Sequence, residues 1–271
     1  MNDEFRNDDL IHFAEHGART LPAAGDQGYV EHESADLWYG GYGDGPAVIL
    51  LHGAFDNSED WGYQIAALVG AGYRAIAIDN RGRGRSSLGS QPLTYALLAD
   101  EVLAVMDALQ LDRAVIVGWS DGAIIALTLA MTHPARVTGV FAFGALMHLS
   151  GLKELDPADA RLARVFGRAK KDFTRLSPTP DAFAATAKAV DRMTGSEPNH
   201  TAEELAAIRA PVAVVVGEFD EFVMREHTDW LMRCIADAER IVLPQVSHFA
   251  LLQRPADFNR AMLAFVRRVL R

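Results

Sequence analysis

The chain has 271 residues, 49% of them hydrophobic, and is therefore long enough to bury a large core. Its net charge is −10, with 26 basic against 36 acidic residues, which argues against a nucleic-acid-binding surface. The single cysteine, Cys234, excludes an internal disulfide framework and a multi-thiolate metal site. Residues 1–6 are polar and acidic where a secretory signal would be basic and then apolar. No apolar stretch reaches the roughly 20 residues that span a bilayer. We therefore expect a cytoplasmic protein without a membrane segment.

The predicted elements begin with an N-terminal arm over residues 1–24, which lack a strand pattern and hold at most a short helix around 9–16. Beyond residue 28, short apolar segments come to alternate with longer amphipathic ones, as βαβ units do. Continuous Val/Ile runs indicate strands covered on both faces, hence a mainly parallel sheet. The predicted strands are 29–33, 35–39, 47–51, 73–79, 114–118, 137–143, 211–217 and 240–243, and the predicted helices are 61–71, 95–109, 122–131, 225–235 and 255–269.

The alternation stops between about 145 and 205. This segment has no Val/Ile strand run and instead holds charged helical stretches at 157–175 and 180–193. We therefore expect a core formed by 25–144 and 206–271, with 145–205 inserted as a helical cap over the strand ends. The alternative is that the insertion only decorates the surface.

A G-x-S-x-G pattern is the strongest chemical signal in the chain. Gly118-Trp119-Ser120-Asp121-Gly122 stands between a predicted buried strand and a predicted helix, the context in which this pattern places a serine on a sharp turn. Glycines are needed at such a turn because a Cβ atom would collide with neighbouring chain. We predict that Ser120 is a nucleophile; the alternative is a plain helix cap.

A serine hydroxyl is a weak nucleophile until a base takes its proton, so the hypothesis requires a histidine and an acid that orients it. In elbows of this kind the acid and then the histidine follow the serine along the chain. His248 lies just beyond the last predicted strand, and Asp220 follows the strand that ends at Gly217. We predict His248 as general base and Asp220 as its acid, because Glu218 is too close to the strand and Glu221 begins the next turn.

The loop after strand 47–51 supplies one of the two predicted oxyanion donors. Gly53 lets this loop pass close to the nucleophile. We predict that the backbone N–H groups of Ala54 and Asp121 bind the oxyanion, the second of them at a helix N-terminus that favours negative charge. His52 is predicted to hold the loop by hydrogen bonds.

Together these segments resemble the α/β-hydrolase superfamily over about residues 28–271. The matching pieces are His52-Gly53, Asp79 to Ser86, Gly118 to Gly122, Gly217 to Asp220 and Ser247-His248-Phe249. Their joint order is more specific than any one of them. The resemblance implies an α/β fold of the α/β-hydrolase type: an eight-stranded, mostly parallel sheet with helices on both faces and a helical cap between the sixth and seventh strands.

The residues at positions 120 and 121 differ from those of some members of the superfamily, which limits the reactions that we expect. Haloalkane dehalogenases and epoxide hydrolases carry Asp as nucleophile, so Ser120 argues against both activities. The Gly-Trp-Ser-Asp-Gly form is similar to that of valacyclovir-hydrolase-like esterases, in which the acidic neighbour is linked to recognition of an amino group. For Asp121 the alternative is an acid favoured by the helix dipole.

Residues beside these motifs are candidates for the walls of a substrate pocket. Trp119 is a core residue in the alternative interpretation. The candidates are Phe55, Trp119, Met147, His148, Phe222 and Phe249.

No cofactor is expected. Gly82-Arg83-Gly84 follows a predicted strand, but Ser87 stands where a dinucleotide-binding loop needs its third glycine. Its arginines are expected to brace loops. We also find no histidine and carboxylate spacing of a metal site, so we expect none.

The sequence therefore predicts an enzyme that acts on a small molecule. The first hypothesis is hydrolysis of a small, largely apolar carboxylic ester, thioester or lactone through an acyl-enzyme. The second is cleavage of a C–C bond or an amide with the same residues, because acyl selectivity depends on the cap and pocket. The third is a ligand-binding receptor of the same fold with slow turnover. The oligomeric state is left open.

Overall fold

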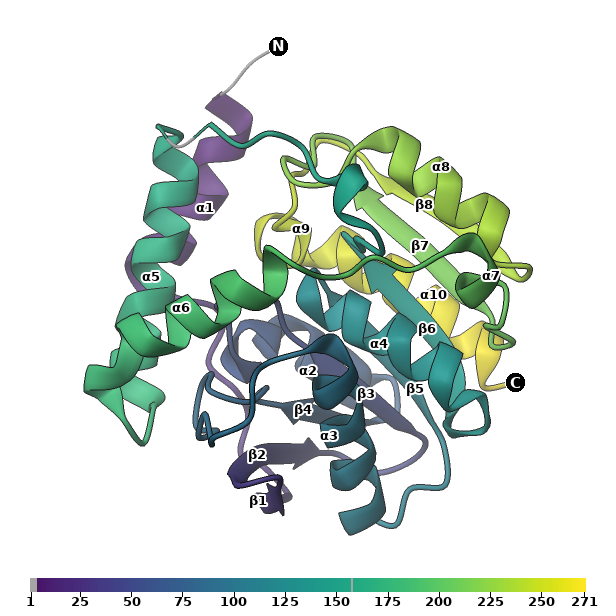
Figure 1. The fold of residues 1–271 in the computed structure, drawn as a ribbon, viewed down its shortest axis with the longest axis horizontal. Helices are drawn as coiled ribbons and strands as arrows, with labels where there is room; N and C mark the ends of the chain where they lie inside the picture. The colour runs from purple at the N-terminus through teal and green to yellow at the C-terminus, as the bar shows by residue number, and fades with distance from the viewer. Residues whose placement is uncertain (1–3, 157) are drawn as a thin grey trace.

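The computed structural model describes residues 4–156 and 158–271, in which an eight-stranded sheet carries helices on both faces (Figure 1). Pro157, where we expected a charged helix to begin, lies outside the described residues. The strands are β1 (Asp26–His32), β2 (Ala35–Tyr42), β3 (Ala47–Leu51), β4 (Arg74–Ile78), β5 (Ala114–Trp119), β6 (Val137–Phe143), β7 (Val212–Gly217) and β8 (Ala238–Leu243). The α-helices are α1 (Glu4–His16), α2 (Gly62–Gly70), α3 (Tyr95–Ala108), α4 (Asp121–Thr132), α5 (Ala160–Leu176), α6 (Phe183–Thr194), α7 (Ala202–Leu205), α8 (Arg225–Cys234), α9 (Ala250–Gln253) and α10 (Pro255–Val269).

The sheet has the order β1-β2-β4-β3-β5-β6-β7-β8. Only the pairings of β2 with β1 and β4 are antiparallel, so β3 to β8 form the parallel part that the Val/Ile runs predicted. Both faces of β5 are buried. Ile116 packs with Leu98 and Ile125 on the α3 and α4 side, whereas Val117 packs with Phe258 on the α10 side. The predicted α/β-hydrolase fold is confirmed.

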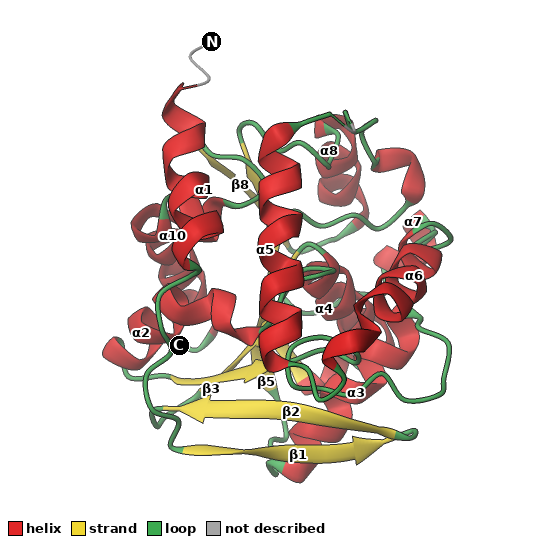
Figure 2. Cartoon of the chain, turned by 90° about the vertical axis from the view of Figure 1, so that its left-hand side faces the viewer, coloured by secondary structure: helices red, strands yellow, loops and turns green. Residues whose placement is uncertain are grey.

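The described residues between β6 and β7, which leave out residue 157, form helices and no strand of the sheet. Helix α5 runs alongside α1, and the two views agree on this arrangement (Figures 1 and 2). Leu10 and Phe13 of α1 are buried in one cluster with Leu162 and Val165 of α5. The N-terminal segment is thus a helix longer than the predicted 9–16, and it packs against the insertion.

Two arginines of the loop after β4 brace neighbouring segments, as expected from the sequence. The side chain of Arg81 is buried, donates to the Glu101 carboxylate of α3 and also reaches the carbonyl of His32 at 2.8 Å. Arg85 donates to Glu59, at 2.5 Å, and to Asp79. Within the described residues no helix has the length and apolar character needed to cross a membrane.

Candidate active site

Ser120 occupies the sharp turn between β5 and α4. Its backbone has φ 55 and ψ −120, a left-handed conformation that is strained for a residue with a side chain. The flanking glycines are sterically required. A Cβ atom on Gly122 would lie 1.9 Å from the carbonyl oxygen of Leu51, and one on Gly118 would lie 2.3 Å from the carbonyl oxygen of Gly122. The turn therefore depends on both glycines of the pattern.

His248 and Asp220 meet beyond the ends of β8 and β7. Nδ1 of His248 lies 2.8 Å from Oδ2 of Asp220, and both side chains are buried. The other carboxylate oxygen of Asp220 accepts hydrogen bonds from the N–H groups of Phe222 and Val223, each at 2.9 Å. These bonds fix the carboxylate and leave Oδ2 to orient the imidazole.

The histidine and the aspartate each favour the charged form of the other. Burial alone would raise the pKa of Asp220, but the charge and hydrogen bond of His248 and two backbone donors lower it below its ordinary value. Burial alone would lower the pKa of His248, but the charge and hydrogen bond of Asp220, with the charges of Glu221 and Asp56, raise it. The site thus contains a histidine that readily accepts a proton.

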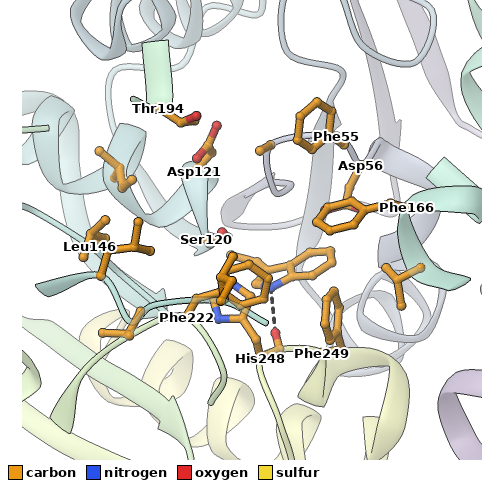
Figure 3. A pocket seen from close by; sticks show the side chains of 18 of the residues that line it. Phe55, Asp56, Ser120, Asp121, Leu146, Phe166, Thr194, Phe222, His248 and Phe249 are labelled. Carbon is orange, nitrogen blue, oxygen red and sulfur yellow. Dashed lines mark hydrogen bonds between the residues drawn. The ribbon is translucent and has the colours of Figure 1, made fainter. Parts of the chain in front are cut away.

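Ser120 and His248 line the same cavity (Figure 3). Nε2 of His248 is buried and, within residues 4–156 and 158–271, has no hydrogen-bond partner, the Ser120 hydroxyl included. The ring is held from other sides: a Cβ atom on Gly144 would lie 2.5 Å from its Cε1, and the ring centroid of Phe222 is 4.5 Å away. A catalytic serine–histidine hydrogen bond is often long until substrate binds. The lack of this bond here therefore leaves Nε2 of His248 available to accept the proton of Ser120.

Ala54 and Asp121 also line the cavity, and the described part of the chain offers neither backbone N–H a hydrogen-bond partner. A Cβ atom on Gly53 would lie 3.5 Å from Cβ of Ser120, so the loop passes close to the serine. His52 fixes this loop: Nδ1 pairs with the Gly53 carbonyl at 2.7 Å, and Nε2 accepts from the N–H of Asn80 at 3.0 Å. Burial lowers the pKa of His52 to about 3, so its ring is neutral, as one donor and one acceptor require.

The cavity has a volume of about 300 Å³. Four of the predicted wall residues line it: Phe55, Trp119, Phe222 and Phe249. Trp119 is also a core residue, because it is 1% exposed and its indole N–H donates to the carbonyl of His248 at 2.8 Å. Both interpretations of this residue therefore apply.

Two predicted wall residues do not belong to this cavity. Met147 is fully buried in the core on the α8 side, and its N–H donates to Nε2 of His227 at 2.9 Å. His148 lies in a separate hollow with His227. The reason is the path of the chain after β6: Gly144 turns it with φ 65, so that Leu146 faces the cavity while the next residues face away.

Several lining residues were not predicted because they come from segments without a local signal. Tyr95 of α3 donates its hydroxyl hydrogen to Asp121 at 2.8 Å, and Phe166 of α5 packs edge-to-face on Phe55 with centroids 5.8 Å apart. Asp56 had a weak signal, a carboxylate two residues beyond the predicted donor Ala54. The remaining lining residues, besides Leu146, are Ile124, Gly144, Leu152, Leu155, Val165, Asp191, Thr194, Glu197 and Val223.

The side chain of Asp121 faces the same cavity from the start of α4. Burial raises its pKa, against the opposing charge of Arg83 and the hydrogen bond from Tyr95. Its second carboxylate oxygen is buried without a hydrogen-bond partner among the described residues. Those residues also include no group of three or more His, Cys, Asp or Glu side chains that could hold a metal ion.

The sequence and the fold are similar to those of known hydrolases. A family model described as "Alpha/beta hydrolase family" matches residues 48–261. Epoxide hydrolase B of Mycobacterium tuberculosis is 45% identical over 98 residues, but this match covers only 35% of the chain and 28% of that protein. The putative carbamate hydrolase RutD of Variovorax paradoxus is 30% identical over 253 residues, which cover 84% of the chain and 94% of that protein. Among solved structures, Est816, described as an N-acyl homoserine lactone degrading enzyme, is 30% identical with a TM-score of 0.71, covering 88% of the chain and 100% of that structure.

Proposed function

The chain belongs to the alpha/beta hydrolase family, and we propose that it is a serine hydrolase that cleaves a small, largely apolar carboxylic ester, thioester or lactone through an acyl-enzyme. One observation carries the proposal: a buried, ion-paired histidine, whose Nε2 has no hydrogen-bond partner in the described part of the chain, shares a cavity with a serine on a strained strand-to-helix turn. In this proposal residues 145–205 form the cap, with 25–144 and 206–271 as core and 1–24 as an arm.

The proposed reaction follows from the atoms that face the cavity. Oγ of Ser120 attacks the carbonyl carbon while Nε2 of His248 takes the hydroxyl proton, and Asp220 stabilises the resulting imidazolium. The N–H groups of Ala54 and Asp121 receive the negative charge that develops on the carbonyl oxygen. His248 then returns the proton to the departing oxygen or sulfur, and a water molecule hydrolyses the acyl-serine by the same route.

The residue at position 120 argues for acyl transfer rather than epoxide opening. The epoxide hydrolase match covers about a third of the chain, and members with that activity carry Asp as nucleophile where this chain has Ser. A cavity of about 300 Å³ with mainly apolar walls suits a small acyl group. The lactone-degrading activity described for Est816 supports an ester or lactone among the possible substrates.

Replacement of Ser120 by Ala tests the proposal. We expect the kcat for p-nitrophenyl butyrate to fall by at least about 10³-fold, and labelling by a fluorophosphonate probe to disappear. Ser196→Ala, an exposed serine outside the cavity, is the matched control and should keep both signals. Unchanged turnover or labelling in purified Ser120→Ala protein would refute the assignment.

Carbamate or amide cleavage is the second candidate, because the putative carbamate hydrolase RutD matches over most of both chains. The same nucleophile and base serve this reaction, with His248 protonating the leaving nitrogen. Side-by-side turnover of an aryl ester, an aryl carbamate and an anilide with the same acyl group distinguishes the two candidates.

A further inference from the structure

The carboxyl group of Asp56 takes no part in the proposed reaction. Asp56 follows the oxyanion loop, lines the cavity, and lies near Phe55 and Phe166 (Figure 3). Within the described ranges its side chain accepts no hydrogen bond and forms no salt bridge. A carboxyl group in apolar surroundings is destabilised unless a donor satisfies it. Asp56 is partly buried and faces the cavity, so its hydrogen-bond donor is water or a group of the bound substrate.

Asp56 is close to the reacting serine. Its Oδ2 lies 2.4 Å from the point where a Cβ atom on Gly53 would stand, and Cβ of Ser120 lies 3.5 Å from the same point. Oδ2 and Cβ of Ser120 are therefore no farther apart than the sum of these two distances. A substrate group that contacts Asp56 lies within a few bonds of the carbonyl under attack.

The charged groups around Asp56 leave it able to bind either as an acid or as a carboxylate. Burial raises its pKa to about 7, with Asp121 and Asp172 adding to the rise and with His248 and Arg83 opposing it. An ionised Asp56 this near the oxyanion would oppose the charge that develops there. A hydrogen-bond donor on the substrate would offset the negative charge of Asp56. Such a substrate would therefore reduce the repulsion between Asp56 and the oxyanion in the transition state.

We propose that Asp56 is the specificity-determining residue of the cavity and accepts a hydrogen bond from a hydroxyl or ammonium group that the substrate carries close to the scissile carbonyl. This inference rests on the proposed function and refines its substrate class from an apolar acyl group to an acyl group with a nearby donor. Two other cavity carboxylates each accept one hydrogen bond from within the protein: Oδ1 of Asp121 accepts from the Tyr95 hydroxyl, while its Oδ2 has no partner among the described residues, and Glu197 accepts from the Tyr95 N–H.

The test compares kcat/KM for p-nitrophenyl esters of butyrate, 3-hydroxybutyrate and 3-aminobutyrate. The wild-type protein should favour an ester with a donor over butyrate by at least about tenfold, the value of a hydrogen bond to a charged group. A preference for the amino ester alone identifies an ammonium ligand, and a preference for both identifies the shared donor.

Two substitutions of Asp56 and one control locate the origin of that preference. Asp56→Leu removes the acceptor and should abolish the preference for both esters. Asp56→Asn keeps an acceptor without charge, so it should lose the amino preference and retain part of the hydroxyl preference. Asp44→Leu removes an exposed carboxylate that does not line the cavity and should leave the ratios unchanged. Equal rates for the three esters in the wild-type protein, or a preference that survives Asp56→Leu, would overturn the proposal.

A binding measurement separates this inference from the proposed reaction. Absence of turnover for all three esters in the wild-type protein would count against the serine hydrolase proposal. Calorimetric titration of Ser120→Ala protein with the methyl esters of the three acids then measures selectivity without chemistry. Tighter binding of the hydroxy or amino ester, lost in the double variant with Asp56→Leu, supports the role of Asp56; equal or undetectable binding of all three contradicts it.

Discussion

Oδ2 of Asp220 lies 2.8 Å from Nδ1 of His248, in a pair that is almost completely shielded from water. If the histidine is the general base, this contact sets its tautomer and stabilises its charged form. Asp220→Asn keeps the shape but presents an amide to Nδ1. We expect kcat for an aryl ester to fall by about 10³–10⁴-fold at neutral pH.

Glu218→Gln is the matched control for that substitution. Its carboxylate belongs to the same loop, but accepts from the N–H of Gln245 at 2.9 Å rather than from the histidine. The control should stay within about threefold of wild type, because it changes an exposed contact. A similar loss in both variants would mean that the loop, and not the orientation of the histidine, limits the rate.

The pH dependence of the reaction provides a second prediction. His248 must be neutral to accept a proton, so kcat/KM for a neutral ester should rise with pH through the pKa of this residue. Burial lowers that pKa, but the charge and hydrogen bond of Asp220, together with the charges of Glu221 and Asp56, hold it above the ordinary value of 6.5. In Asp220→Asn burial dominates, and the rise should move to lower pH.

The pH–rate profiles of the Asp56→Asn variant and of the double variant with Asp220→Asn check this expectation. Asp56 has a pKa of about 7 and interacts with His248, so its removal separates the two titrations. A midpoint that Asp220→Asn leaves in place contradicts the ion-paired base.

The sequence predicted the parts of this protein that local patterns determine. The Val/Ile runs indicate buried parallel strands without further information. Contacts with the adjacent chain require glycine at positions 118 and 122, so the sequence pattern predicted the turn at Ser120. The positions of His248 and Asp220 after their strands followed from the rule that parallel strand ends meet at one edge.

The parts that failed depend on how loops turn in three dimensions. Met147 was predicted as a wall of the cavity, but the chain that turns at Gly144 brings Leu146 to the cavity instead. Phe166 and Tyr95 reach the site from α5 and α3, and no spacing in the sequence links those helices to Ser120. Prediction of such residues needs the packing of these helices around the site, which the hydrophobic pattern does not specify.

The glycine after the serine gives a prediction on stability. A Cβ atom at Gly122 would lie 1.9 Å from the carbonyl oxygen of Leu51, a backbone atom that cannot move without displacing β3. We expect Gly122→Ala to lower the free energy of unfolding by at least about 3 kcal/mol, measured by urea denaturation.

Gly70→Ala is the control for that prediction. Gly70 ends α2, and a Cβ atom there would meet nothing within 4 Å. The substitution should be neutral or stabilise the protein by up to about 1 kcal/mol, because alanine favours a helix over glycine. Equal stabilities of the two variants would show that the contact with Leu51 is not limiting.

The buried pair of Arg81 and Glu101 gives the last prediction. The guanidinium donates to this carboxylate of α3 and to the carbonyls of His32 and Glu33, so it ties the loop after β4 to a helix and to the turn between β1 and β2. Glu101→Gln leaves a fully buried cation without its counter-charge, and the expected loss of unfolding free energy is about 3–5 kcal/mol. Asp257→Asn, which breaks the exposed pair with Arg260, should change it by no more than about 0.5 kcal/mol. Urea denaturation of both variants measures the difference, and a loss below about 1 kcal/mol for Glu101→Gln would mean that water or a neighbouring carbonyl compensates the guanidinium.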